Sequence, residues 1–340
     1  MDAFEWMSPQ DIEQATRAAT ATVAAAMVSR SGEPESGGAL IKAGGIDLLD
    51  LMKEGLLKPR RLVNLRDVAG LDRIEEADGG LRIGPNVTLS QLAGHAQVRM
   101  RFRALSEACG AAASPQIRHL ATLGGNLLQR PRCWYLRSRA HHCARKGGDN
   151  CFAFAGENQY HAIFDHKGCA IVHPSTCATA LVAFGARLEI TGPTGARREV
   201  SVEEFFLLPE ADLHHENTLE PGEIITAIVL PAPAQSTRSL YFKQCETESF
   251  DWPVAEVAVV LELASGVCRK AAVVLGAAAP APHRAKAAEA ALTGKRIDEA
   301  LIRAAARAAL QGAAPLGKNG YKLTIFETLV RRALLAATAG

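Results

Sequence analysis

The stretch from Gln116 to Leu127 decides the fold of this 340-residue chain; it reads Gln-Ile-Arg-His-Leu-Ala-Thr-Leu-Gly-Gly-Asn-Leu. Two consecutive glycines let main-chain N–H groups approach a phosphate closely, because no Cβ stands in the way. A helix that begins just after such a turn adds partial positive charge, which favours the same ligand. The segment does not fit the Gly-x-Gly-x-x-Gly pattern, so a Rossmann site is not expected.

A second glycine pair, Gly44-Gly45, lies between an expected strand at Ala39–Ile41 and an expected helix at Leu48–Glu54. Two such turns can hold one dinucleotide diphosphate from both sides. Taken singly, each pair is explained first by a plain tight turn. Together, they predict a dinucleotide site between two α/β segments.

The hydrophobic pattern predicts short strands and helices that alternate before about residue 131, which is typical of an α/β arrangement in that part of the chain. We expect one helix at Pro9–Val28, a bent strand at Leu81–Leu89 and a helix capped by Ser90. The remaining expected strands are Arg61–Leu65, Arg187–Ile190, Ile224–Leu230, Ser239–Lys243, Ala255–Leu263 and Cys268–Leu275. The remaining expected helices are Cys177–Phe184, His283–Leu292, Asp298–Leu310 and Lys322–Ala337.

Composition narrows the class of protein. Lys and Arg total 38 against 36 Asp and Glu, so no broad nucleic-acid or anionic-membrane surface is expected. No stretch approaches the roughly 18–20 apolar residues of a spanning helix. The N-terminus lacks a basic region followed by an apolar run, so we expect no secretory signal. We therefore expect a cytoplasmic protein, with periplasmic export alongside a partner subunit as the alternative.

Four of the eight cysteines fall in a segment, about 131–169, that has no clean periodicity and is rich in Arg, His and Gly. Cys133, Cys143, Cys151 and Cys169 have the spacing C-x9-C-x7-C-x17-C. Four thiolates suit a [4Fe–4S] cluster, with one per iron. Zinc, with His141 or His142 as ligands, is an equal alternative on spacing alone, since both sites use soft ligands. Unligated thiols are the third possibility, and Cys177 is a substitute for Cys169 that we expect to pack in the core.

The two glycine turns and their flanks resemble motifs of the FAD-binding (medium) subunits of the xanthine dehydrogenase, or molybdenum hydroxylase, family. The resemblance continues in order through His173-Pro174-Ser175, Tyr241-Phe242-Lys243 and Ser249-Phe250-Asp251 to the segment from Leu275 to Lys295. It therefore covers nearly the whole chain. It implies an oxidoreductase subunit that carries FAD.

The resemblance implies the fold and its division. We expect an α+β chain with the vanillyl-alcohol-oxidase-like (PCMH-type) FAD-binding fold in residues 1–231, as two α/β subdomains at about 1–60 and 61–231. An insertion at about 131–169 would lie in the second subdomain. A small C-terminal domain of antiparallel strands and helices, like that of carbon monoxide dehydrogenase flavoproteins, would follow at 236–338.

The resemblance also implies which residues hold FAD, but no catalytic acid or base. The main chain of the first turn would hold the diphosphate through Lys42, Ala43, Gly44, Gly45, Ile46, Asp47, Leu48 and Leu49. The second turn and other contacts would add Gln116, Thr122, Leu123, Gly124, Gly125, Asn126, Thr176, Ile225 and Lys243. Lys243 matches a family lysine beside the flavin, where positive charge stabilises the reduced, anionic ring.

Two positions depart from the family pattern. Thr176 stands where the family commonly has Asp after His-Pro-Ser, so it brings a hydroxyl but no charge. The run Glu246-Thr247-Glu248 stands where the family tends to have Arg. Both departures bear on the environment of the flavin and on the electron acceptor.

The cysteine insertion resembles one subgroup of the family. Leu128–Tyr135 and Gly148–Ala153 are similar to insertions in the flavoprotein subunits of periplasmic aromatic aldehyde oxidoreductases and 4-hydroxybenzoyl-CoA reductases. In that subgroup the insertion holds a [4Fe–4S] cluster, which implies Cys133, Cys143, Cys151 and Cys169 as its ligands. The six cations of the segment would then compensate an anionic cluster or dock a partner, unless they form a solvated loop.

These inferences favour an electron-transfer subunit of a molybdenum hydroxylase complex. Partners would be a large molybdopterin-binding subunit, which oxidises a substrate such as an aldehyde, and a small [2Fe–2S] subunit. Electrons would pass through FAD to an external acceptor. The alternatives are reduction of an aromatic acyl-CoA, a free-standing FAD oxidase and a non-catalytic binding protein. An oxidase needs a base beside the flavin, and His214-His215, in an acidic loop, is expected at the surface.

Overall fold

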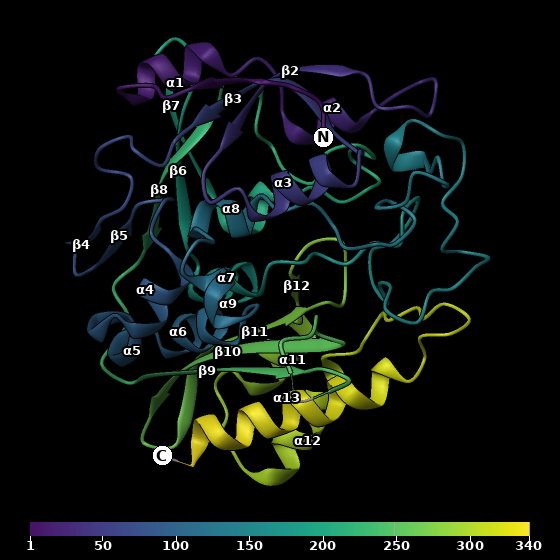
Figure 1. Cartoon of the computed structure of the whole chain (residues 1–340). Helices are drawn as coiled ribbons and strands as arrows, with labels where there is room; N and C mark the ends of the chain where they lie inside the picture. The colour runs from purple at the N-terminus through teal and green to yellow at the C-terminus, as the bar shows by residue number, and fades with distance from the viewer. Residues whose placement is uncertain (248, 340) are drawn as a thin grey trace.

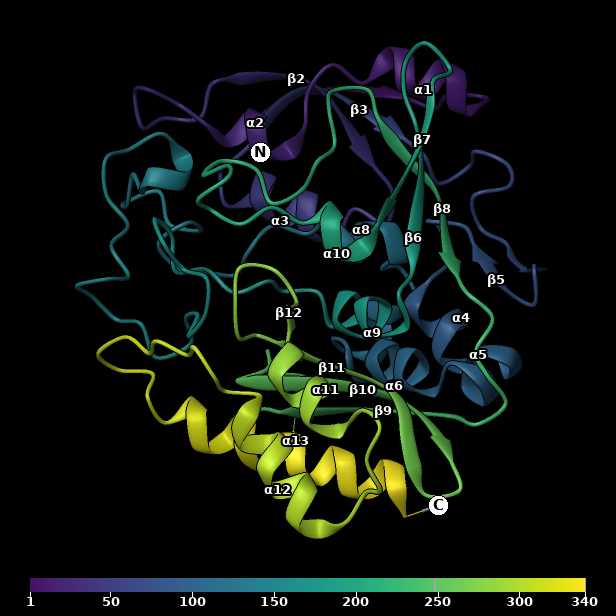
Figure 2. The ribbon, with the colours of Figure 1, turned by 180° about the vertical axis from the view of Figure 1, so that it is seen from behind.

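The computed structural model describes residues 1–247 and 249–339, and Figures 1 and 2 show it from opposite sides. Near the N-terminus lies a parallel sheet of three strands in the order β1-β3-β2. Its strands are β1 (Glu5–Met7), β2 (Ser36–Lys42) and β3 (Lys58–Asn64). Helix α3 (Ile46–Lys53) makes the crossover from β2 to β3 that a parallel pair requires.

The two faces of this sheet are buried in different clusters. Leu40 and Leu62 pack with α3, whereas their neighbours Ala39 and Val63 pack on the opposite side with α1 (Ile12–Ala18). Successive strand residues point to opposite faces, so one short apolar run serves both clusters. Helix α2 (Val23–Met27) covers the α3 side through Met27.

An antiparallel sheet of five strands forms the second layer, in the order β4-β5-β8-β6-β7. Its strands are β4 (Ile74–Ala77), β5 (Gly80–Ile83), β6 (Arg187–Thr191), β7 (Arg197–Ser201) and β8 (Ile224–Leu230). The helices of this part are α4 (Leu89–Gly94), α5 (Ala96–Arg101), α6 (Arg103–Ala111), α7 (Pro115–Arg118), α8 (Leu123–Leu127), α9 (Thr176–Phe184) and α10 (Val202–Phe205). Most of these helices share one large apolar core with the sheet.

The C-terminal part is an antiparallel sheet in the order β12-β11-β10-β9. Its strands are β9 (Thr237–Gln244), β10 (Ala255–Ala264), β11 (Val267–Gly276) and β12 (His283–Arg284). Helices α11 (Lys286–Leu292), α12 (Glu299–Ala308) and α13 (Lys322–Thr338) complete it, and α13 packs along β9 and β10. Figure 1 shows α6 and α9 above this sheet and α12 and α13 below it, so helices cover both faces.

The α+β class is confirmed, and so is the C-terminal arrangement of antiparallel strands and helices. The expected domain limits, 1–231 and 236–338, stay predictions. None of the helices formed by residues 1–247 and 249–339 combines the length and apolar character that a membrane span requires.

Three local predictions were wrong. The expected single helix at Pro9–Val28 is two helices, because Thr22 leaves the helical conformation and caps α2 with its hydroxyl. The bent strand ends at Ile83, and Thr88 rather than Ser90 caps α4, in a capping box with Gln91. The start of the expected helix at His283 is instead strand β12.

The insertion at 131–169 is irregular, as predicted, with one 3-10 turn, η1 (Ala144–Lys146), assigned within it. It lies at one side of the molecule, between the N-terminal helices and the segment that leads into α13 (Figures 1 and 2). Hydrogen bonds to residues inside the insertion join it to both of these neighbouring parts of the chain. Ser29 donates its N–H to the Lys146 carbonyl, and Lys318 donates its N–H to Asn158 Oδ1 at 2.9 Å.

Candidate functional site

A cleft of about 500 Å³ opens between the parallel sheet, the five-stranded sheet and the C-terminal part. Both glycine turns line it, at Gly44-Gly45 and Gly124-Gly125. The first turn follows the carboxyl end of β2, which is where open α/β sheets bind their ligands. The structure therefore brings the two turns, about 80 residues apart in sequence, to one site.

Gly44 is required where the two turns meet. A Cβ at Gly44 would lie 2.3 Å from the carbonyl oxygen of Leu120, which precedes the second turn. Gly45 caps α3 in the left-handed conformation, with a φ of 81°. Both glycines therefore have a conformational or steric reason to be present.

The first turn offers free main-chain donors. Within the described part of the chain, the N–H groups from Ala43 to Leu48 have no hydrogen-bond acceptor. Three of these groups, at Ile46 to Leu48, form the first turn of α3, where the helix itself supplies no acceptor. This row of donors at a helix N-terminus fits the diphosphate of a dinucleotide.

The second turn contributes differently. Leu123 and Gly124 donate their N–H groups to the carbonyls of Val87 and Pro85, and Gly125 donates to Thr122 Oγ1 at 3.2 Å. A Cβ at Gly124 would lie 2.8 Å from the Pro85 Cβ. These glycines allow close packing of α8 against the loop before α4, while the free donors come from the first turn.

The structure gathers most of the predicted FAD contacts. The cleft is lined by Lys42, Ala43, Gly44, Gly45, Ile46, Asp47, Leu48, Thr122, Gly124, Gly125, Asn126, Thr176, Ile225 and Lys243. Three others lie outside its lining. Leu49 packs beside the α3 core, Gln116 is exposed, and Leu123 is buried in the large core.

Two lysines supply positive charge to the cleft. Lys243 on β9 donates through Nζ to the Ala111 carbonyl at 2.9 Å. Lys42 donates to Asn64 Oδ1 at 3.2 Å, and burial together with the charge of Arg66 lowers its pKa.

The two departures from the family pattern lie at different distances from the cleft. Thr176 is 4% exposed and donates to the Ala108 carbonyl at 3.4 Å. The hydroxyl that stands in place of the family carboxylate is thus bonded to the main chain of α6. Thr247 lies in the loop after β9, and Glu248 lies outside the described residues.

Several cleft residues were not predicted from the sequence. Arg130 and Arg132 enter from the insertion, Glu216 from the loop before β8, and Trp252 from the loop before β10. The Arg132 guanidinium lies 4.5 Å from the centre of the Trp252 ring. The sequence signal for the arginines was the cationic insertion. Nothing in the sequence pointed to Glu216.

Asp47 joins the first turn to the insertion. Its carboxylate accepts hydrogen bonds from the Arg130 N–H at 2.8 Å and from Arg137 Nη2 at 2.6 Å, and it pairs with Arg132 at 2.8 Å. Asp50, one turn further along α3, pairs with Arg137 at 2.9 Å. Of the alternatives for the insertion cations, the solvated loop does not apply to Arg132 and Arg137, because their side chains pair with Asp47 on α3.

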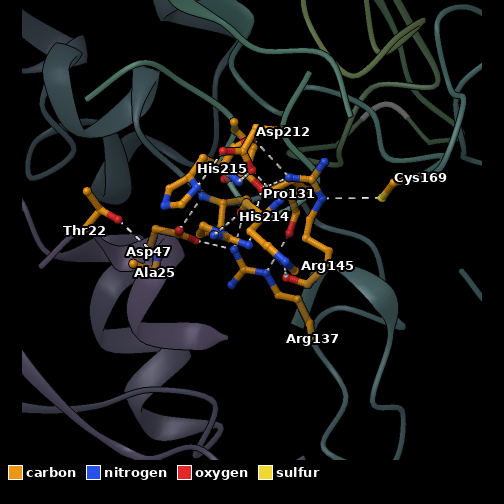
Figure 3. A network of polar contacts seen from close by, with 12 residues as sticks. Thr22, Ala25, Asp47, Pro131, Arg137, Arg145, Cys169, Asp212, His214 and His215 are labelled. Atoms are coloured by element: carbon orange, nitrogen blue, oxygen red, sulfur yellow. Dashed lines mark hydrogen bonds and ion pairs between the residues drawn. The ribbon is translucent and has the colours of Figure 1, made fainter. Parts of the chain in front are cut away.

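A second network lies deeper. Glu216 pairs with Arg145 at 2.8 Å and with Arg130 at 3.3 Å, and all three side chains are at most 7% exposed. Arg145 also donates its Nε–H towards Cys169 Sγ at 3.4 Å, as Figure 3 shows. The His214-His215 pair was expected at the surface, but both residues are partly buried here, and their carbonyls accept from Arg130 and Arg145.

The four cysteines of the insertion are near enough to affect one another's ionisation. Burial raises the pKa of Cys133 to about 12 and raises that of Cys143, and in both the neighbouring Cys169 adds to the shift. A hydrogen bond with Cys169 raises the pKa of Cys151, while the same bond and the charge of Arg145 hold the pKa of Cys169 below its usual range. The sulfur beside Arg145 is therefore the one best suited to be a thiolate.

Nearby main-chain N–H groups act to lower the pKa of all four thiols. They belong to Tyr135 and Leu136 for Cys133, Arg145 and Lys146 for Cys143, Ala153 and Ala170 for Cys151, and Ile171 for Cys169. Cys177, which was expected to pack in the core, does so, since it is fully buried with its sulfur 3.5 Å from that of Cys109. Among the described residues, no three His, Cys, Asp or Glu side chains are arranged to hold one metal ion.

Comparison with known families identifies this arrangement. Residues 2–233 match the family described as FAD binding domain in molybdopterin dehydrogenase. The chain belongs to this family. Residues 240–337 match the CO dehydrogenase flavoprotein C-terminal domain. The predicted fold, a PCMH-type FAD-binding fold followed by a small C-terminal domain, is confirmed.

Individual relatives agree with the family. The chain is 35% identical to the aldehyde oxidoreductase FAD-binding subunit PaoB of Escherichia coli (strain K12), over 89% of this chain and 92% of the relative. It is 28% identical to the carbon monoxide dehydrogenase medium chain of Afipia carboxidovorans, over 87% and 88% of the two chains. A solved structure of carbon monoxide dehydrogenase from Hydrogenophaga pseudoflava matches with a TM-score of 0.73 and 27% identity. The match covers 99% of this chain and 98% of that one.

The predicted function class is therefore confirmed. The chain is an FAD-binding oxidoreductase subunit of the molybdopterin dehydrogenase family. The free donors of the first turn, the close approach of the second and the two cleft lysines fit that cofactor.

Proposed function

We propose that this chain is the flavin subunit of an aldehyde-oxidising molybdenum complex and that it carries a [4Fe–4S] cluster in its insertion. One observation carries the proposal. The four-cysteine insertion is bound directly to the FAD turn, through the ion pairs of Asp47 with Arg132 and Arg137. Two redox groups in these places would be held side by side by one rigid set of contacts.

The FAD contacts proposed are the residues predicted from the sequence, from Lys42 to Leu49 and from Thr122 to Asn126, with Gln116, Thr176, Ile225 and Lys243. FAD supplies the exchange between paired and single electrons. The chain's own part is to present free N–H groups to the diphosphate and to place the Lys243 amine in the cleft. The proposed limits are 1–231 for the FAD-binding domain and 236–338 for the C-terminal domain.

The proposed cluster ligands are Cys133, Cys143, Cys151 and Cys169. Hydrogen bonds from main-chain N–H groups to the sulfurs are a means by which proteins tune such clusters, and here nearby main-chain N–H groups act to lower the pKa of all four thiols. A single zinc ion would bring four ligands to one point. No three His, Cys, Asp or Glu side chains converge in this way among the described residues. The resemblance of the insertion favours the cluster, and metal analysis separates the two kinds of site.

Buried charge supports the same assignment. Arg145 and Arg130 share the single carboxylate of Glu216, so this trio carries a net positive charge away from water. Arg145 Nη2 has no hydrogen-bond partner among the residues that the structure describes. An uncompensated buried cation is costly unless an anion lies close by. The Cys169 thiolate, or an anionic cluster bound to it, would supply that charge.

The substrate and partners follow from the similarity to the aldehyde oxidoreductase subunit. The proposed partners are a large molybdopterin-binding subunit and a small [2Fe–2S] subunit, and the proposed direction is from aldehyde to FAD to an external acceptor. Reduction of an aromatic acyl-CoA is the second candidate, favoured only by the four-cysteine insertion. The proposed location is the cytoplasm, with co-export to the periplasm as the alternative.

The test is co-expression with the genes of the two partner subunits, followed by purification, metal analysis and EPR. We expect one FAD per copy of this chain, four irons beyond those of the [2Fe–2S] centres, no zinc, and aldehyde-dependent flavin reduction. Zinc in place of the extra iron would overturn the cluster. An active flavoprotein that purifies alone and oxidises a small alcohol or amine would overturn the electron-transfer role.

A further inference from the structure

A buried chain of charges runs from the cysteine insertion to the FAD cleft. Arg145 contacts Cys169 Sγ at one end, and its Nη1 lies 2.8 Å from Glu216 Oε1. Glu216 Oε1 in turn lies 3.3 Å from Arg130 Nη2, and both Glu216 and Arg130 line the cleft. Each link is shielded from water, since Arg130 is 2% exposed and Arg145 is 1% exposed.

The two arginines have donors to spare. Arg130 Nε and Arg145 Nη2 are buried and have no hydrogen-bond partner within residues 1–247 and 249–339, and Arg130 Nη2 is in ion-pair range of Glu216 without making a hydrogen bond to it. The carboxylate of Glu216 therefore does not satisfy the two guanidiniums that it joins. Unsatisfied buried donors on charged groups are rare in proteins, and they point to an anionic neighbour on each side.

We infer that Arg145 and Glu216 set the reduction potential of the cluster proposed at Cys169, with opposite signs. The inference rests on the proposed function, because it needs the cluster. Reduction adds one electron, so a nearby cation stabilises the reduced state and a nearby anion opposes it. Charges in a site that excludes water act strongly, because screening there is weak.

Single substitutions test both directions of the expected shift in the reduction potential of the cluster. In Arg145→Gln the trio loses one positive charge and becomes neutral, so the potential should fall. In Glu216→Gln the trio loses its negative charge while the side chain keeps its shape, so the potential should rise. Arg145→Lys keeps the positive charge but loses the planar guanidinium, so the reduction potential of the cluster should stay close to the wild-type value.

The matched control is Arg139→Gln, which removes one arginine charge from the same insertion. Arg139 pairs with Glu33 at 3.0 Å, and both side chains are more than half exposed. Solvent screens exposed charges, so this change should leave the potential unchanged. Arg139 has no part in the proposed cluster or FAD contacts.

The experiment is a redox titration of the complete complex, with the four-iron EPR signal as the readout and iron and FAD content measured for each variant. We expect Arg145→Gln and Glu216→Gln to change the ratio of reduced to oxidised cluster at a fixed potential by about tenfold in opposite directions. For a one-electron couple this is about 59 mV each way.

Shifts of the same sign in both variants, or no shift relative to Arg139→Gln, would overturn the inference while leaving the cluster in place. Absence of extra iron from the wild-type complex would overturn the proposed cluster, and the inference with it. If Arg145→Gln loses iron, the other two variants decide, because both keep a buried polar group at their positions. A raised potential in Glu216→Gln with a near-wild-type potential in Arg145→Lys supports the inference, and an unchanged or lowered potential in Glu216→Gln overturns it.

Discussion

The carboxylate of Asp47 and the guanidinium of Arg137 lie 2.6 Å apart, although 90 residues separate them in sequence. Asp47 is also part of the first glycine turn, where its main-chain N–H has no acceptor among the described residues. One residue thus uses its main chain for the cleft and its side chain for the insertion. Loosening the insertion should therefore disturb the FAD turn.

Substitution of Asp47 by Asn tests this connection. Asn keeps the shape but loses the ion pairs with Arg132 and Arg137, which are at most 23% exposed. We expect the free energy of unfolding to fall by on the order of 2–4 kcal/mol, together with lower FAD content. Urea denaturation and the flavin absorbance per chain measure the two effects. Glu33→Gln, which breaks the exposed pair with Arg139, is the control and should change neither.

Substitution of Gly44 by Ala tests the approach of the two turns. The new Cβ would meet the Leu120 carbonyl, so the turns must separate at a cost of about 1–3 kcal/mol and FAD should be lost. Gly94→Ala is the matched control, because Gly94 ends α4 and, apart from its chain neighbours and its own helix backbone, no atom of the described residues lies within 4 Å of the place that its new methyl group would take. Equal FAD content in the two variants would contradict the proposed site.

Much of this fold can be predicted from the sequence because its signals are local. The strand before Gly44-Gly45, the helix after it and the C-terminal strands follow from hydrophobic period and turn residues, and the structure contains them. The errors have local causes as well. Strands β1 and β4 have only three and four residues, too few to show a period, and their pairing partners define them.

The charged networks are a different matter, because their partners are distant in sequence. Arg145 and Glu216 are 71 residues apart, and neither belongs to a recognisable motif. The sequence alone indicates an arginine-rich loop in the insertion and an acidic loop around residues 212–217, and charged loops of this kind usually lie at a solvated surface. Only the packing of the insertion against the 212–217 loop shows that their charges are buried and paired.

His173 should make the protein sensitive to acid. Burial lowers its pKa to about 3, and its Nδ1 accepts the Ser175 N–H at 3.2 Å, so the folded state holds the neutral ring. When the pKa of a histidine is lower in the folded state than in the unfolded state, the protein loses stability as the pH falls below the unfolded-state pKa of about 6.5. This residue should contribute a loss of about 2 kcal/mol between pH 8 and pH 5.

The check is the difference between urea unfolding free energies at pH 8 and pH 5, in the wild type and in His173→Asn. Asn retains an acceptor for the Ser175 N–H but does not titrate in this range. The unfolding free energy of His173→Asn should therefore fall less between pH 8 and pH 5 than that of the wild type, by the amount that His173 contributes. An equal loss in the two proteins would show that other groups cause the acid sensitivity.

Lys243 should favour the reduced flavin. Its amine lines the cleft and is fixed by the hydrogen bond to the Ala111 carbonyl, on a strand whose partner residue Glu256 is buried. Positive charge near the flavin ring stabilises the charge gained on reduction. In Lys243→Gln we expect a lower flavin reduction potential, measured by absorbance during a redox titration of the complex, with FAD content retained.

The control is Lys270→Gln, which removes one lysine charge from the same sheet. Lys270 pairs with Glu262 and is exposed, so solvent screens its charge and the flavin potential should not change. If both variants keep the wild-type potential, the Lys243 amine acts on the structure of the cleft wall rather than on the charge of the flavin.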